Sequence, residues 1–472
     1  MNNRTAWTFA ITSIALFMVT LDNLVVTTAI PVIRAHLHAS LPSLEWTVNA
    51  YTLTFAVLLL TGAALGDRFG RRRLFTVGAA IFTAGSAAAA LSPSVSVLNL
   101  ARAVQGVGGS IVLPLTLTIL SAAVPARKRG LALGVWGGIS GVAVALGPVV
   151  GGAIVQALSW QWIFWLNVPI GAALVVLAPF RLAETRGPVV RLDLRGLTLS
   201  AAGLFCTVWG LVRGNSHGWA STEILTTLTA GVMLLAVFVA WELRAETPML
   251  PMRLFRSAAF TLANTASLFM YFGMFGSIFL LSQFFQTVQH DSPLGSGLRI
   301  LAWTIVPMFV SPVAGALSDR IAGRTLIGTG LAMQAAGLAW LGLATAPATT
   351  YPAFMGPFLL AGAGMGLFFA PMANVVLSSV RPAQHGQASG ANNAIRELGG
   401  VLGVAVLATI FSSLGGYRTG HVFVASMDPA LLIGAAVVAA GAAAALAIPR
   451  GQSTVRSEAA LPEARSSERV NV

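Results

Sequence analysis

The chain has 472 residues, of which 56% are apolar and only 9% are charged. Because soluble domains carry about 25% charged residues, this composition excludes an ordinary soluble protein and predicts one built for lipid. The formal net charge is +13, but the cations lie in short loops between apolar segments, which indicates membrane topology and not nucleic-acid binding. Cys206 is the single cysteine, so the sequence excludes an internal disulfide and a cysteine-based metal site.

Long apolar runs predict an all-α integral membrane protein with about fourteen spans, since a helix needs about 20 apolar residues to cross a bilayer. The first eight spans are expected near 7–30, 46–66, 74–92, 97–121, 131–156, 163–180, 197–213 and 222–243. The other six are expected near 258–282, 298–317, 324–345, 352–376, 392–414 and 429–448. The first run is too long, and followed too soon by another span, to be a cleaved signal peptide.

Basic residues gather in alternate loops between the predicted spans. One set of loops holds Arg68, Arg71, Arg72, Arg73, Arg127, Lys128, Arg129, Arg181, Arg186, Arg191, Arg195, Arg244, Arg253, Arg256, Arg320, Arg324 and Arg381. The opposite set holds only Arg34, Arg213, Arg299 and Arg418. Since cytoplasmic loops are enriched in arginine and lysine, we expect both termini in the cytoplasm. Residues 450–472 are polar and mixed in charge, which predicts a disordered cytoplasmic tail.

The single lysine excludes one source of energy. Lys128 is flanked by Arg127 and Arg129 and lacks the glycines of a phosphate-binding P-loop. We therefore expect no ATP-hydrolysing loop and no nucleotide cofactor, so that any work must draw on an ion gradient or a partner. The histidines near positions 36–38 and 290 form no convincing metal constellation, and no metal is expected.

Two charged residues lie inside predicted spans, where charges are costly and usually functional. Asp22 is in the first span and Arg102 is in the fourth, which runs the opposite way. Both are expected at a similar depth in the outer half, so that an ion pair across a central cavity is possible. Burial and a neighbouring arginine act on a carboxylate's proton affinity in opposite directions, as suits a group that gains and loses protons. A static pair that only holds helices together stays an open alternative.

Other charged and helix-bending residues mark later spans. Arg396 and Glu397 are neighbours near the inner end of the penultimate span and point about 100° apart on a helix. Two interpretations stay equally open: one of the two residues faces the transport pathway, or their side chains snorkel to the membrane interface. The fifth span carries Gly147, Pro148, Gly151 and Gly152. Small residues let helix backbones approach closely, and proline bends a helix, so this bend is a candidate seal between helices that rock.

An acid-plus-arginine cluster recurs in the two halves of the chain. The segment Ala64–Arg73 reads ALGDRFGRRR after the second span, and a near copy, ALSDR, lies at Ala316–Arg320. Both copies close an apolar run and open a basic loop. The repeat indicates a duplicated membrane unit.

These residues together resemble the major facilitator superfamily, and specifically its fourteen-span drug:proton antiporters. The segment 63–74 resembles the loop motif after the second span, and the segment 21–31 is similar to the first-span motif, with Leu24 and Thr27 in place of the usual threonine and asparagine. Arg102, Gln105 and Gly106 fit the fourth-span motif whose arginine is associated with proton transfer. Gly147-Pro148 with Gly151-Gly152 resembles the antiporter-associated fifth-span motif. The segment 160–171 is similar to one particular to the fourteen-span group, with Gln161 replacing its usual arginine.

The resemblance implies two six-helix bundles around a midplane cavity. Residues 1–180 and 258–449 would form the bundles, and residues 181–257 would contribute two extra linking spans. It also implies a gating latch. The first copy of the repeat would supply its residues Asp67, Arg68, Gly70, Arg71 and Arg72, backed by Arg73, and the second copy would supply Asp319 and Arg320 as a weaker counterpart.

The function that we expect from sequence and resemblance is proton-coupled efflux of an amphipathic small molecule, such as a drug or antibiotic, across the bacterial inner membrane. Asp22, tuned by Arg102, would be protonated from outside and release the cargo, which these two residues are placed to meet. We expect a monomer that is not an enzyme and needs no cofactor or ATPase partner. The alternatives are a proton symporter that imports a nutrient, an intramembrane enzyme, and a non-transporting sensor or scaffold.

Overall fold

The computed structural model describes residues 3–38, 41–187, 193–246, 248, 250–318, 320–381 and 384–449, and every regular element in them is helical. The first helices are α1 (Asn3–Leu37), α2 (Leu41–Phe69), α3 (Arg71–Ala90), α4 (Val95–Ala123), α5 (Ala126–Ala157), α6 (Trp162–Trp165) and α7 (Asn167–Arg181). They are followed by α8 (Leu194–His217), α9 (Thr222–Glu242) and the 3-10 helix η1 (Met252–Arg256). The last are α10 (Ala258–Thr287), α11 (Pro293–Thr304), α12 (Val306–Leu317), α13 (Gly323–Ala344), α14 (Tyr351–Ser378), α15 (His385–Ser413) and α16 (Gly420–Leu446).

Most of these helices are long and apolar enough to cross a membrane. The described residues hold 13 such helices, with α6–α7 and α11–α12 each counted as one, and up to 14 with the bent helix α5. The prediction of about fourteen spans in an all-α membrane protein is confirmed. The predicted tail over 450–472 lies outside the described residues.

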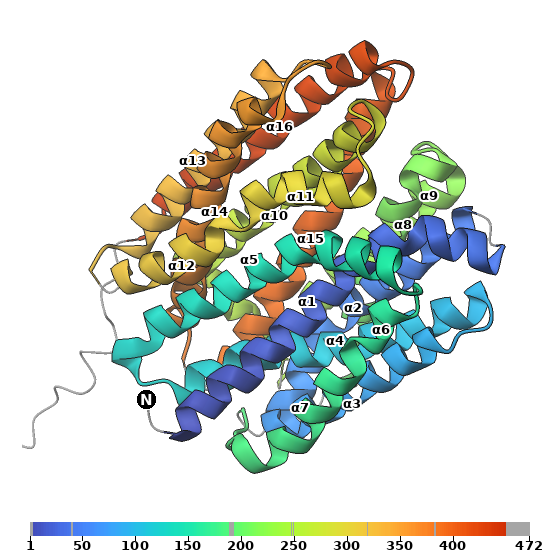
Figure 1. Cartoon of the computed structure of the whole chain (residues 1–472). Helices are drawn as coiled ribbons and strands as arrows, with labels where there is room; N and C mark the ends of the chain where they lie inside the picture. Colours follow the sequence, from blue (N-terminus) through green and yellow to red (C-terminus); the bar gives the residue numbers. More distant parts are fainter. Residues whose placement is uncertain are drawn as a thin grey trace, which may run out of the picture.

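The helices pack as two bundles (Figure 1). We call α1–α7 the first bundle and α10–α16 the second bundle. Helix α5 packs on α1 within the first bundle and on α12 of the second, while α2 packs on α4 and, across the boundary, on α15. Apolar side chains fill the interior of each bundle, and the largest buried cluster belongs to the second.

The helices α8 and α9 form a hairpin beside the bundles (Figure 1). Helix α8 packs on both α2 and α15, so it covers the seam between the two bundles on that side. Leu204 and Val208 of α8 are buried against Leu53 and Val57 of α2. Helix α9 packs chiefly on α8 and exposes Val232 and Met233, as a lipid-facing helix does.

Candidate functional site

A buried ion pair joins α1 to α4. The Nη1 atom of Arg102 lies 2.5 Å from Oδ2 of Asp22, and both side chains have an exposed fraction of 0%. Because an unpaired charge inside an apolar bundle is very costly, each residue depends on the other for its place there. The sequence therefore predicted this pairing correctly, although it placed the pair across a central cavity.

The other oxygen of Asp22 accepts two amide donors. Nε2 of Gln105 donates at 2.8 Å and Nδ2 of Asn167 at 2.7 Å, both to Oδ1. Asn167 begins α7 and also donates to Ser86 of α3 at 3.1 Å. Three helices of the first bundle, α1, α4 and α7, thus meet at one carboxylate, and α3 is joined to it through Asn167. Charged and amide donors to a carboxylate suit its negative charge.

Aromatic rings and a carbonyl enclose Arg102. Its Nε donates to the carbonyl oxygen of Thr47 at 3.1 Å, and its guanidinium carbon lies 4.2 Å from the centre of the Tyr51 ring and 5.8 Å from that of Phe164. Its Nη2 is buried and has no hydrogen-bond partner in the described structure. All of these contacts lie inside the first bundle. Neither side chain reaches a surface in this conformation, and a direct contact between the pair and the cargo stays a prediction.

A second ion pair lies at the end of the molecule where α2 ends and α3 begins, which we call the basic end. Nε of Arg71 donates to Oδ1 of Asp67 at 2.8 Å, and both side chains are almost fully buried. The N–H of Gly187 donates to the Asp67 carbonyl at 2.9 Å. Oδ2 of Asp67 is buried beside Gly386, in the first turn of α15, where the helix dipole favours a negative charge.

The remaining arginines of this motif do not contact Asp67. The backbone N–H of Arg72 donates to Oε1 of Glu184 at 3.0 Å, and the side chains of Arg72 and Arg73 lie 3.5 and 3.8 Å from its Oε2. Arg68 is exposed and lies over the Phe69 ring. Arg72 and Arg73 thus bind Glu184, in the segment after α7, and their part in a gating latch stays a prediction.

Gly70 forms the turn between α2 and α3. Its φ of +110° is a conformation that other residues rarely adopt, and a Cβ there would lie 2.8 Å from Cδ of Glu184. In the second copy of the motif, Asp319 lies outside the described residues and Arg320 is exposed. A latch role for this second copy stays a prediction.

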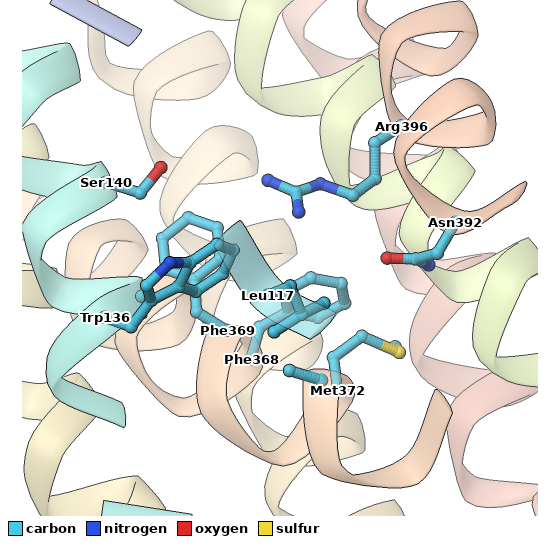
Figure 2. A pocket seen from close by; sticks show the side chains of 10 residues that line it. Leu117, Trp136, Ser140, Phe368, Phe369, Met372, Asn392 and Arg396 are labelled. Carbon is cyan, nitrogen blue, oxygen red and sulfur yellow. The ribbon is translucent and has the colours of Figure 1, made fainter. Parts of the chain in front are cut away.

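Arg396 lies near the middle of α15 and borders a small cavity between the bundles (Figure 2). The atom-free space there is about 370 Å³, including its open mouth. Arg396 donates to the Tyr271 hydroxyl, its guanidinium carbon lies 4.4 Å from the centre of that ring, and its Nη1 lies 3.3 Å from Oδ1 of Asn393. Glu397 is half-buried, outside the cavity lining, and close enough to Tyr51 and Tyr271 to act on both electrostatically.

The glycines of α5 lie at two different contacts. The axis of α5 bends by 43° between its segments Leu131–Val144 and Val149–Ala157, where the sequence predicted a bend; the side chain of Pro148 lies outside the described structure. A Cβ at Gly147 would lie 2.6 Å from Cβ of Leu24 in α1, and one at Gly152 would lie 2.9 Å from Cβ of Leu294 in α11. Gly151 is buried in the same turn. Helix α5 therefore packs closely on α1 of its own bundle and on α11 of the second bundle.

Several residues of the site were not predicted from the sequence. Gln105 and Asn167 lie in family-like segments but had no predicted role, and neither did Tyr271, Asn392 and Glu184. The asparagine inside the apolar segment 160–171 was the one available signal, since a buried amide needs a polar partner. Among the described residues, no group of three or more His, Cys, Asp or Glu side chains could hold a metal ion.

Two bundles of membrane-spanning helices, with a buried ion pair inside the first and a cavity bordered by Arg396 between them, define a multi-pass membrane transporter. A sequence profile of the Major Facilitator Superfamily matches residues 12–404 and 263–468. The chain belongs to this superfamily.

Named relatives support the same assignment. The multidrug efflux pump LfrA of Mycolicibacterium smegmatis is 34% identical over 445 residues, which cover 94% of this chain and 87% of the relative. The tetracenomycin C resistance and export protein of Streptomyces glaucescens is 34% identical over 414 residues, which cover 87% and 76%. Among solved structures, the proton:xylose symporter XylE matches with a TM-score of 0.67 at 15% identity over 94% of this chain and 96% of its own, a likeness of fold alone.

Proposed function

We propose that the protein exports an amphipathic small molecule, such as a drug or antibiotic, from bacteria in exchange for protons. The relatives whose names state export or multidrug efflux support the cargo class and the direction. The protein acts in the inner membrane, as a monomer, with both termini in the cytoplasm, which places the basic end inside. The proton gradient drives it, without a cofactor or an ATPase partner.

The Asp22 carboxylate carries the proton coupling in this proposal. It is fully buried, paired with Arg102 and held by Gln105 and Asn167. Protonation neutralises Asp22 and weakens its bond to Arg102, so that the ion pair no longer fixes the position of α1 against α4. Because α1, α4 and α7 meet at this carboxylate and α3 is joined to it through Asn167, its charge sets the packing of the first bundle.

Tyr51 contacts the buried pair. Its ring lies against Arg102 and its hydroxyl is 3.3 Å from the Val19 carbonyl oxygen. A change of charge at Asp22 moves α4 against α15, which packs on α4 and carries Arg396 at the cavity and Gly386 at the basic end. The Asp67–Gly386 contact closes the basic end in one of the two states.

Inside-out vesicles that carry a proton gradient test this function. Lipophilic drugs added outside are expected to dissipate the gradient, as followed with a pH-sensitive dye, and Asp22→Asn is expected to abolish the effect. Asp291→Asn, which changes an acid paired with Arg299 far from the bundle interiors, serves as the matched control. If no drug dissipates the gradient, or if Asp22→Asn behaves like the parent, proton-coupled export is wrong. Cells that the protein sensitises to the drugs would indicate import instead.

A further inference from the structure

Among the described residues, the cavity between the bundles has a mostly apolar lining with a few polar groups, which include the hydrogen-bond donors of Arg396 and Trp136. It is bordered by α4 and α5 of the first bundle and by α14 and α15 of the second (Figure 2). Its lining is neutral or apolar except for one cation, Arg396, and includes no carboxylate. Glu397, the neighbouring acid on α15, does not border it.

Arg396 is a guanidinium within a membrane-spanning helix that has no carboxylate in ion-pair contact anywhere in the described structure. Its partners are the Tyr271 hydroxyl and the amide oxygen of Asn393, both neutral. Arg102, by contrast, is neutralised by Asp22. A charge at this depth is costly unless an opposite charge binds it. Glu397, the next residue, interacts with Arg396 electrostatically but makes no ion-pair contact with it, so the guanidinium can still bind a ligand that brings a negative charge.

A second donor points to the same ligand chemistry. The Nε1 atom of Trp136 on α5 is buried and has no hydrogen-bond partner in the described part of the chain, and Trp136 borders the cavity. Figure 2 shows the guanidinium of Arg396 extending from α15 into the space that faces Trp136 and Ser140. An unmade buried hydrogen bond is costly, so a ligand acceptor placed between these two side chains would satisfy both.

The apolar part of the lining includes two phenylalanine rings, a methionine and a leucine. Phe368, Phe369 and Met372 come from α14, and Leu117 comes from α4. Aromatic rings pack on rings at offset or edge-on angles, and methionine fits irregular shapes. The Asn392 amide nitrogen is occupied by Asn264 at 3.0 Å and Ser267 at 3.1 Å, which leaves its oxygen as a neutral acceptor for a ligand hydroxyl.

We infer that this cavity binds planar aromatic molecules carrying a negative charge, such as phenolates and aromatic carboxylates, in preference to aromatic cations. The inference names the cargo class of the proposed exporter and rests on that function. Arg396 binds the anionic oxygen, Trp136 donates to the same group or its neighbour, and the phenylalanines contact the ring system. The bundles must separate to admit a molecule of this size, since the cavity is small in this conformation.

Equilibrium binding to the purified full-length protein tests the charge preference without a proton gradient. Fluorescein and rhodamine 6G share a xanthene ring and carry opposite charges, so anisotropy titrations compare charge at nearly constant shape. We expect fluorescein to bind at least about tenfold more tightly, the scale of one charge-assisted hydrogen bond. Arg396→Gln is expected to remove this preference, Arg396→Lys to keep part of it, and Trp136→Phe to weaken fluorescein alone by about threefold.

Arg299→Gln is the matched control, because Arg299 also lies over a tyrosine ring but near the start of α11, outside the cavity lining. It is expected to leave both affinities unchanged. Thermal unfolding verifies that each variant is folded. If Arg396→Gln does not fold, Trp136→Phe still tests the site. Equal or tighter binding of rhodamine 6G, or a preference that survives in both Arg396→Gln and Trp136→Phe, overturns the inference.

The vesicle assay separates this inference from the proposed function. Proton exchange driven by cationic drugs only would leave export standing and overturn the anion preference. Selective fluorescein binding without any drug-driven proton exchange would support the site and overturn proton-coupled export.

Discussion

Gly386 of the second bundle lies directly against the Asp67 carboxylate of the first. A Cβ built at Gly386 would fall 2.1 Å from Oδ2 of Asp67 and 2.4 Å from its Cγ, so no side chain larger than hydrogen fits between them. The contact exists only while the basic ends of α2 and α15 meet, and the α15 dipole attracts the carboxylate. This single glycine therefore controls how closely the two bundles approach at the basic end.

Gly386→Ala is expected to open the basic end, because overpacking a close contact costs about 1–3 kcal/mol. Spin labels at the exposed positions Val77 of α3 and Thr325 of α13, in a Cys206→Ser background, report the separation between bundles at this end. Pulsed electron resonance should show the longer distance gaining population in Gly386→Ala. Drug-driven proton exchange should fall, since the closed state is part of the cycle.

Gly400→Ala is the matched control for this experiment. Gly400 lies on the same helix, but its added Cβ would meet Phe275 within the second bundle, at 3.0 Å. The distance distribution should not change in this variant. An unchanged distribution in Gly386→Ala would show that the contact does not limit the approach of the bundles.

The Asp22–Arg102 pair makes a prediction about stability. Removing one partner of a buried pair leaves an uncompensated charge, so Asp22→Asn should lower the free energy of unfolding by about 3–5 kcal/mol. The double variant Asp22→Asn with Arg102→Gln removes both charges and should recover most of that loss. Neither variant should couple transport to protons. Thermal unfolding in detergent measures the first effect and the vesicle assay the second.

Glu223→Gln provides the comparison for an exposed pair. Glu223 contacts Arg213 at 3.1 Å, with the two side chains 46% and 28% exposed, and its loss should cost less than about 1 kcal/mol. A double variant at Asp22 and Arg102 that is no more stable than Asp22→Asn would mean that charge compensation does not hold this pair together.

The span pattern and the Asp22–Arg102 pairing were predictable from sequence because both depend on position along a helix. Apolar length sets where a span lies, and residue counting sets the depth of a charge within it. The partners Asn167 and Tyr51 were not predictable, because they depend on how each helix is rotated about its axis and on which helices are neighbours. The depth of the pair could be counted from the sequence, but its position inside the first bundle, and not at a central cavity, depends on helix rotation.

The contact between Glu184 and the arginine cluster shows the same limit in a loop. Asp67 and Arg71 are only four residues apart across the Gly70 turn, and this local spacing is enough to bring them together. The path of the segment after α7 depends on the packing of α7 against α1 and α3. Only that tertiary arrangement brings Glu184 to Arg72 and Arg73, so the sequence around Asp67 does not reveal which acid these arginines bind.

Asn167→Ala should lower the stability of the first bundle. Asn167 donates to Asp22 at 2.7 Å and to Ser86 at 3.1 Å, and a hydrogen bond to a charged group contributes about 1.5–3 kcal/mol. Without it, the free energy of unfolding should fall by about 2 kcal/mol, as thermal unfolding in detergent measures. Ser86→Ala, which leaves the Asn167–Asp22 bond in place, should lower the stability less. An Asn167→Ala variant as stable as the parent would contradict the proposed role.

Glu184→Gln should loosen the basic loop. The carboxylate accepts the Arg72 amide N–H and lies near two guanidinium groups, and partly exposed pairs of this kind contribute about 1 kcal/mol. Hydrogen exchange followed by mass spectrometry should show the peptide that contains Arg71–Arg73 exchanging about fivefold faster. Glu246→Gln, at an exposed acid after α9, should leave that peptide unchanged. Equal exchange in Glu184→Gln and the parent would show that Glu184 does not hold the loop.

Gly147 is required by the approach of α1 to α5, and a double-mutant cycle with Leu24 tests this. An added Cβ would lie 2.6 Å from Cβ of Leu24, so Gly147→Ala should lower the free energy of unfolding by about 1–3 kcal/mol. Leu24→Ala keeps the Cβ and should not relieve the clash, whereas Leu24→Gly removes it and should. In the cycle, only Gly147→Ala combined with Leu24→Gly should therefore show a coupling energy. Gly138→Ala on the same helix meets nothing closer than 3.4 Å and should be tolerated.

Two outcomes would contradict this account of Gly147. Coupling with Leu24→Ala as strong as with Leu24→Gly would locate the clash further out on the leucine side chain. No coupling with either would assign the effect to the bend of α5, and the role of Gly147 would then be to bend the helix and not to admit α1.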